Sequence, residues 1–209
     1  MPATAQENEW RLVRSNDVIN IWQSKSKADG ISTIKAELTT KSTLSGFLLF
    51  LQDTANIPNW LDNSDYSEII AQLTPTRNVF ITQFEGVWPV KSRNMVIETE
   101  YVQNDDFSID IFVQDASTKA EQISDSIRVT VNQAHWHIKP IIDSGIQIQY
   151  QFSVDPNGAI PDWLVNKMTL DSVWKTLNNI HQQLPSSSWQ DFSISNIEEP
   201  TRENSAEMR

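Results

Sequence analysis

The sequence predicts an α+β fold, in which an antiparallel β-sheet is followed by one long C-terminal helix. The 209 residues, of which 39% are hydrophobic, are enough for one globular domain with a sizeable core. Most of the predicted strands follow one another with short turns between them, and strands joined in this way pair antiparallel. After Gly158 the apolar residues change from a period of two to the period of a helix.

The chain begins with strands. Trp10–Ser15 opens the sheet, and Val18–Gln23 and Ile31–Leu38 form a hairpin across the turn residues Asp29 and Gly30. The hydrophobic pattern therefore starts the fold with three strands.

Two short helices are expected after this hairpin. The first covers Thr43–Thr54, with Ser42 or Thr43 as its N-cap. Its apolar residues recur at helical spacing, at Leu44, Phe47, Leu48 and Leu51. Pro58 prevents a simple continuation, so a second short helix or turn is expected around Asn59–Asn63.

Six further strands are expected in the middle of the chain. Their ranges are Tyr66–Leu73, Arg77–Phe84, Asn94–Gln103, Phe107–Gln114, Ile127–Lys139 and Gly145–Val154. The last of them alternates most clearly, with apolar residues at every second position and three glutamines and a serine between them. One face of the sheet should therefore be apolar and the other polar.

The C-terminal helix is expected to run from Pro161 to Leu184, because proline suits a first helical turn and Pro185 stops the helix. We assign residues 1–185 to the domain and residues 186–209 to a polar, acidic tail. The residues that could attach the first half of this tail to the domain are Trp189, Phe192, Ile194 and Ile197.

Composition excludes several classes of function. The chain has no cysteine, which excludes disulfides, a thiol nucleophile and thiolate metal sites. Its net charge of −11 argues against nucleic acid as a partner. The longest apolar run has five residues, so no membrane-spanning helix is expected. The N-terminus lacks the pattern of a secretory signal, so a cytoplasmic location is the simplest interpretation, with a mature secreted form as the alternative.

Common catalytic and cofactor motifs are also missing. Neither a glycine-rich phosphate loop nor a nucleophile elbow is present, so we expect no cofactor. His135 and His137 share a strand face as metal ligands would, but a surface histidine pair is the simpler interpretation. Glu98 and Glu100 could form an acid–base pair, although a solvated sheet edge explains them better. Core packing explains most of the eight tryptophans, and lining a cavity is the alternative.

Three segments, which follow one another in the family's order, resemble the START family of lipid-transfer domains related to the steroidogenic acute regulatory protein. The resemblance is to the bacterial single-domain type of this family. Trp88–Asn94 is similar to the family's W-P-x-x-x-R-D signature. Ile127–Arg128 followed by Ile138–Pro140 is similar to its next pair of strands. Asp155–Asn166 resembles its D-x-x-G-x-x-P-x-x-x-x-N entry into the C-terminal helix.

The resemblance implies a helix-grip fold, in which a curved antiparallel sheet wraps around the long C-terminal helix and leaves an elongated cavity for one lipid. We expect a non-catalytic lipid-binding and lipid-transfer protein, in which about sixteen buried methylenes would contribute on the order of 13 kcal/mol. The residues expected to bind the ligand are Arg93, Met95, Ile97, Tyr150, Phe152, Met168, Val173, Leu177 and Ile180. The family's gating loop corresponds to Gln114–Ser126, for which an ordinary surface loop is the alternative.

Two positions depart from the family pattern. Asn94 stands where many members have aspartate, so Arg93 needs another partner. Thr99 stands where the sterol-binding branch has an arginine, which puts sterol binding through a buried ion pair in doubt. Arg93 could anchor a head group or carboxylate, but tying its strand to a neighbouring turn is the simpler role.

Two other functions stay open at this stage. One is a helix-grip enzyme of the aromatase/cyclase kind, acting on a polyketide-like or aromatic substrate, which would require acid–base groups inside the cavity. The other is an interaction protein whose acidic tail recruits a partner. For the leading interpretation we expect a monomer that touches membranes only transiently, through apolar loop residues.

Overall fold

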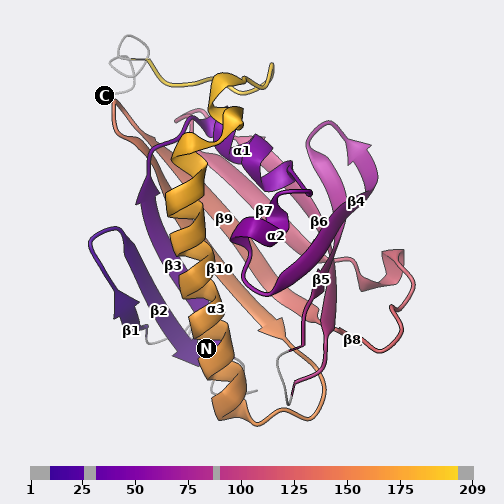
Figure 1. Ribbon diagram of the computed structural model, residues 1–209. Coiled ribbons are helices and arrows are strands. Elements are labelled where there is room, and N and C mark those ends of the chain that lie inside the picture. The colour runs from indigo at the N-terminus through magenta and orange to yellow at the C-terminus, as the bar shows by residue number, and fades with distance from the viewer. Residues whose placement is uncertain (1–9, 26–31, 87–89, 202–209) are drawn as a thin grey trace, which may run out of the picture.

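The computed structural model describes residues 10–25, 32–86 and 90–201 and has the predicted order of strands and helices (Figure 1). The strands are β1 Arg11–Ser15, β2 Ile19–Lys25, β3 Ser32–Thr40, β4 Ser64–Thr74, β5 Arg77–Phe84, β6 Arg93–Gln103, β7 Ile109–Asp115, β8 Ile127–Arg128, β9 Thr130–Ile141 and β10 Gly145–Asp155. The helices are α1 Leu44–Gln52, α2 Ile57–Trp60 and α3 Asp162–Gln183, with short 3₁₀ turns η1 Ser117–Lys119, η2 Leu184–Ser186 and η3 Ser188–Asp191.

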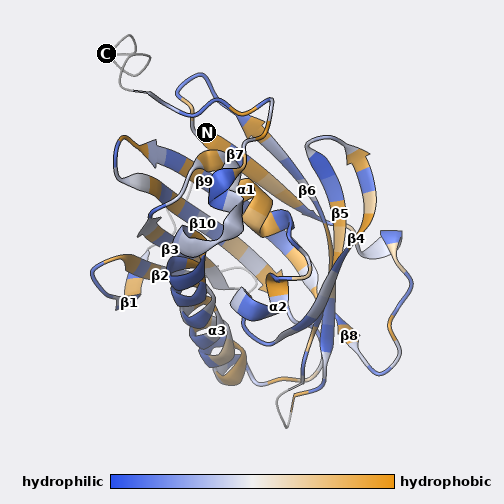
Figure 2. Cartoon of the chain, turned by 45° about the horizontal axis from the view of Figure 1, so that its top comes forward, coloured by the Kyte–Doolittle hydropathy of each residue, from blue (hydrophilic) through white to orange (hydrophobic). Residues whose placement is uncertain are grey.

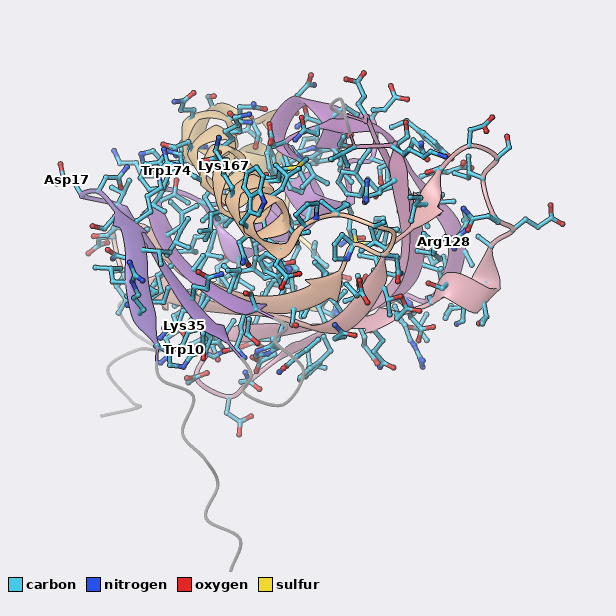
Figure 3. The ribbon with its side chains drawn as sticks, turned by 90° about the horizontal axis from the view of Figure 1, so that it is seen from below. Trp10, Asp17, Lys35, Arg128, Lys167 and Trp174 are labelled. Carbon is cyan, nitrogen blue, oxygen red and sulfur yellow. The ribbon has the colours of Figure 1, made fainter. Side chains whose placement is uncertain are left out.

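Nine of the described strands form one open antiparallel sheet in the order β1-β2-β3-β10-β9-β7-β6-β5-β4, and the short β8 pairs with β6 in parallel. The N-terminal hairpin pairs with the last strand, since β3 lies beside β10, so the first three strands join the sheet next to the strand that comes last in the sequence. Viewed from below, the sheet is a trough and α3 lies along its concave side (Figure 3). This confirms the curved sheet and the long C-terminal helix that the resemblance implies.

Alternation along the strands separates the two faces of the sheet. Figure 2 shows apolar and polar residues alternating along most strands, while α3 is largely hydrophilic on the side seen there. The main core lies on the concave side, and its largest fully buried side chains include Ile34, Leu38, Ile138 and Ile148. A smaller cluster of Val79, Ile81, Val96 and Ala116 is buried on the convex side.

The two short helices close the trough at the end away from the start of α3 (Figure 1). Thr43 is the N-cap of α1, and its hydroxyl accepts a hydrogen bond from the Gly46 N–H at 2.9 Å. Helix α2 begins at Ile57, two residues before the predicted start, because Pro58 lies in the first turn, where no N–H is needed.

Residues 186–201 pack onto the domain. Ile197 is buried, and the Trp189 indole N–H donates to Asp53 at 3.0 Å. Both carboxylate oxygens of Glu199 accept hydrogen bonds from the first N–H groups of α1, those of Leu44 at 2.9 Å and Ser45 at 2.8 Å. The described part of the tail is therefore part of the packed structure.

Some predictions differ from the structure or lie outside it. The strand predicted over Ile127–Lys139 is divided at Val129, because the Val129 N–H bonds to the Asn94 carbonyl before the chain turns into β9. The predicted turn at Asp29 and Gly30 and the Trp88–Pro89 part of the signature lie outside the described residues. Among the described helices, none is long and apolar enough to cross a membrane.

Candidate functional site

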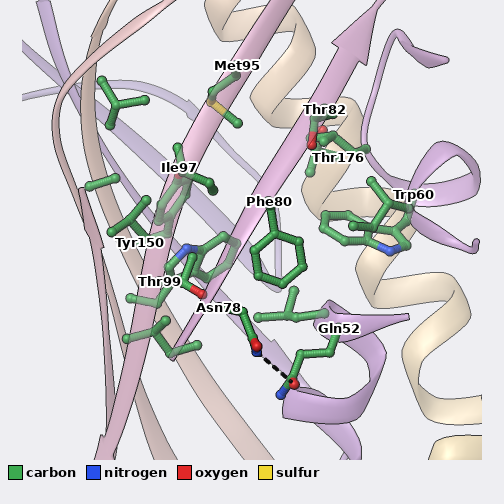
Figure 4. A pocket seen from close by; sticks show the side chains of 18 of the residues that line it. Gln52, Trp60, Asn78, Phe80, Thr82, Met95, Ile97, Thr99, Tyr150 and Thr176 are labelled. Carbon is green, nitrogen blue, oxygen red and sulfur yellow. Dashed lines mark hydrogen bonds between the residues drawn. The ribbon is translucent and has the colours of Figure 1, made fainter. Parts of the chain in front are cut away.

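An apolar pocket of about 210 Å³ lies between the concave face of the sheet and all three helices (Figure 4). We refer to it as the pocket. Its walls come from β5, β6, β7, β9 and β10 on one side and from α1, α2 and α3 on the other. The pocket therefore occupies the space between the sheet and the C-terminal helix in which the sequence analysis expects a ligand.

Aromatic side chains form one side of the pocket. Tyr150 of β10 lies directly opposite Trp136 of β9, and their rings stack at 3.9 Å between centroids. Phe152 stacks on the other side of Tyr150 at 4.9 Å. Burial raises the pKa of the Tyr150 phenol, because the charged form would lose its hydration. Tyr150 is therefore a neutral group at physiological pH.

Strands β5 and β6 supply the opposite side through their alternation. Phe80 and Thr82 of β5 face the pocket, and they pair with Ile97 and Met95 of β6. Side chains at every second position reach the same face of a strand, so Val79 and Ile81 point to the convex side instead.

The helical walls come from three short stretches of chain. Helix α3 contributes two adjacent pairs of residues, one turn apart, Ser172–Val173 and Thr176–Leu177. Helix α1 contributes Leu48, Leu51 and Gln52, and Trp60 ends α2 beside them. Asp62 accepts a salt bridge from Lys175 and its N–H bonds to the Thr176 hydroxyl, which fixes the end of α2 against α3.

No residue of the described pocket wall carries a formal charge at neutral pH. The ionisable groups among the described lining residues are the phenols of Tyr101 and Tyr150. The other polar residues on the wall are uncharged: Gln52, Thr76, Asn78, Thr82, Thr99, Ser172 and Thr176. The wall is thus suited to an apolar molecule that has few polar atoms.

Five of the nine predicted ligand-binding residues lie on the pocket wall, namely Met95, Ile97, Tyr150, Val173 and Leu177. The other four lie elsewhere. Ile180 is fully buried in the core, Phe152 is buried behind Tyr150, and Met168 is half-buried earlier on α3, outside the lining. Their part in binding, like that of the five, stays a prediction.

Arg93 is the fourth residue outside the pocket lining. Its guanidinium donates to three backbone carbonyls, those of Lys91 at 2.6 Å, Pro156 at 3.0 Å and Asn157 at 3.1 Å. These bonds tie the start of β6 to the turn before α3, as expected for the simpler of its two roles. The partner that Arg93 needs in place of an aspartate is therefore this turn.

None of the remaining wall residues was among the predicted ligand-binding residues; examples are Trp60, Asn78, Phe80, Thr99 and Trp136. The alternation of β5 contained the signal, because Asn78 and Thr82 share a face with Phe80. Their polar side chains did not match an apolar cavity pattern. Trp60 and Trp136 are among the residues that line the pocket, as the alternative interpretation of the tryptophans predicts.

The histidine and glutamate pairs lie on the convex face, away from the pocket. His135 Nε2 and His137 Nδ1 both lie 2.8 Å from the same oxygen of Asp110. In the described part of the chain no group of three or more His, Asp or Glu side chains is arranged to hold a metal ion.

Glu98 differs from its predicted surroundings. It is only 6% exposed and is bonded to Lys119 and Arg77, so the expectation of a solvated edge is wrong for this residue. The hydrogen bond from Lys119 and the charge and hydrogen bond of Arg77 hold the pKa of Glu98 below its ordinary value, although burial opposes them.

The segment Gln114–Ser126 also packs on the convex face. Ala116, Ala120 and Ile123 contact the convex cluster, and the Arg128 guanidinium bonds to carbonyls in the same segment. The prediction that this segment gates the cavity is wrong, because it lies on the opposite face of the sheet from the pocket.

Comparison of the chain with known proteins identifies the fold to which it belongs. No family model matches the chain. An uncharacterized protein of Pseudomonas aeruginosa is 21% identical over 182 residues, which cover 84% of this chain and 87% of that protein. The structure of a STAR-related lipid transfer protein of Xanthomonas axonopodis aligns with a TM-score of 0.74 and 21% identity, over 84% of this chain and 98% of that one.

A human structure gives the same result. Human StAR-related lipid transfer protein 5 aligns with a TM-score of 0.74 and 15% identity, over 85% of this chain and 87% of that one. At these identities the likeness shows the fold. The chain therefore has the helix-grip fold of the START domains.

Proposed function

We propose that this protein binds one small hydrophobic molecule in the pocket and carries it without making or breaking a bond. The observation that supports this most directly is the uncharged, largely apolar pocket wall between the sheet and α3. Two proteins that share the fold are named as lipid transfer proteins, which is consistent with the same kind of ligand.

The pocket volume limits the size of the ligand. At roughly 30 Å³ for each methylene-sized group, about 210 Å³ holds about seven such groups. Burying seven methylenes contributes about 6 kcal/mol before the cost of association is subtracted. A chain of sixteen methylenes requires a larger pocket, so we propose a short single-chain or small cyclic ligand for this conformation.

The alternative of an aromatase/cyclase-like enzyme requires an acid or base beside the substrate. The described wall offers the two phenols of Tyr101 and Tyr150, and the raised pKa makes Tyr150 a poor acid or base near pH 7. No specific observation favours catalysis, so we propose binding alone.

Native mass spectrometry of the purified full chain, followed by solvent extraction, tests the proposal. A hydrophobic molecule should co-purify with the protein. Ala134→Phe should abolish this ligand load, because Ala134 lines the pocket from β9. Gln133→Phe is the matched control, since Gln133 is the exposed neighbour on the same strand and faces the other way. Equal loads in the two variants would refute the proposal.

We further propose that the carrier is a monomer and touches membranes only briefly. With a net charge of −11, the contact should be made by apolar loop residues and not by a basic patch. Transfer between vesicles that slows as salt is raised would contradict this. If the tail instead recruits a partner, deleting residues 202–209, which keeps the Glu199 cap of α1, should remove the partner and leave the ligand load unchanged.

A further inference from the structure

Three polar side chains gather at one end of the largely apolar pocket. Asn78 of β5 lies directly opposite Thr99 of β6 in the strand register, and both face the pocket. Gln52, the last residue of α1, reaches toward Asn78 from the helical side (Figure 4). We call Gln52, Asn78 and Thr99 the polar end of the pocket.

Asn78 is the least satisfied member of this group. It is 3% exposed, and its amide nitrogen is 3.4 Å from the Gln52 side-chain oxygen, which is long for a hydrogen bond. Its Oδ1 has no hydrogen-bond partner in the described part of the chain. Buried polar groups are nearly always bonded, so an acceptor left unpaired on a pocket wall indicates a missing donor.

The missing donor should be uncharged. An ammonium would need a carboxylate to offset its loss of hydration, and a carboxylate would need an arginine, lysine or metal ion. None of the described wall residues carries a formal charge at neutral pH. A hydroxyl or a primary amide has the required donor, and the terminal torsion of Asn78 is soft enough to turn its oxygen toward such a group.

We propose that the polar end selects the head group of the ligand, and that the ligand is an uncharged aliphatic alcohol or primary amide. This inference rests on the proposed function. Its O–H or N–H donates to Asn78 Oδ1, and its short chain runs along Phe80 and Ile97 toward the aromatic side of the pocket. Ionised fatty acids and phospholipids are excluded by the same uncharged wall.

Isothermal titration calorimetry with three eight-carbon probes tests this inference on the full chain. The probes are 1-octanol, heptyl methyl ether, which accepts but cannot donate, and octanoate at pH 7.5. We expect 1-octanol to bind about tenfold more tightly than the ether, the factor that one buried hydrogen bond contributes. Octanoate should bind most weakly.

Asn78→Leu should abolish the difference between octanol and ether while the ether still binds. The matched control is Asn132→Leu, the same substitution at an exposed residue of β9 outside the pocket lining, which should keep the preference. If Asn78→Leu does not fold, Thr99→Val provides the second variant and should reduce the preference.

The outcomes separate this inference from the proposed function. Equal affinity for octanol and ether, or tightest binding of octanoate, would overturn the head-group assignment and leave a hydrophobic carrier. An undiminished preference in Asn78→Leu would also overturn it. Failure of all three probes to bind would refute the carrier function together with the inference.

Discussion

Replacing Glu199 with alanine should loosen the first turn of α1 and lower the stability of the whole domain. The four N–H groups at the start of a helix have no partner within the helix. Here the Gln190 side-chain oxygen accepts from Thr43, Glu199 accepts from Leu44 and Ser45, and the Thr43 hydroxyl accepts from Gly46. The variant leaves two of these four donors without their partner.

The structure sets the magnitude of this effect. A side-chain cap contributes about 1 kcal/mol, and a carboxylate at a helix N-terminus adds a further 0.3–1 kcal/mol, roughly, through the helix dipole. Glu199 is half-buried, so water replaces it only in part. We expect a loss of about 1–2 kcal/mol, which corresponds to a decrease in Tm of about 2–8 °C for a chain of this length.

Urea unfolding followed by tryptophan fluorescence and circular dichroism measures this loss. Glu198→Ala is the control, because it removes the same charge one residue away, from an exposed position. Glu198 bonds to Gln103 only through its backbone N–H and carbonyl. If the two variants are equally stable, the packing of the tail against α1 does not hold in solution, and the capping account is refuted.

Three further predictions concern other groups. Lys119 and Arg77 hold the pKa of Glu98 below its ordinary value of 4.5, so the stability that ionised Glu98 gives the fold is complete above that pH and is lost as pH falls through the lower folded-state pKa. Glu98→Gln should therefore be less stable than wild type at pH 7. Urea unfolding from pH 7 to 3 should show this difference in stability shrinking below about pH 4.5. Burial raises the pKa of Tyr150 above its ordinary value of 10.0, so wild type should lose stability above that pH more steeply than Tyr150→Phe, and matching slopes in alkaline unfolding would contradict this. Arg93→Lys should lower stability by about 1–2 kcal/mol because the fork of donors to three carbonyls is lost, with probe affinities unchanged in calorimetry; a weaker affinity for octanoate in this variant would instead place Arg93 on the ligand.

Local pattern predicted most of the fold. The alternation of β10 and the cap and apolar spacing of α1 are local properties, and each appears where the sequence places it. The division of the predicted Ile127–Lys139 strand was not predictable in this way. It depends on the Val129 N–H pairing with a strand that lies more than thirty residues earlier.

The site was predicted less completely than the fold. Met95, Ile97 and Tyr150 were found because apolar residues at alternate positions mark an inward face. Asn78 and Thr99 share such a face, but their polarity assigns them to the surface when only the sequence is read. The opposite error occurred at Arg93 and the 114–126 segment, which were expected at the cavity but do not line the pocket. Neither a charged residue nor a long loop reveals from the sequence which side of the sheet it contacts.

The sequence by itself determined the order of the strands and helices, the inward and outward positions along each strand, and the lack of thiol chemistry and of a strongly basic surface. Only the tertiary structure decided which inward faces enclose the pocket, that α1 and α2 help to close it, and that Glu199 caps a helix 155 residues away. The reason is physical: periodicity is set by neighbours along the chain, whereas a pocket and its unpaired acceptor are set by side chains that meet only after the sheet has curved around the helix.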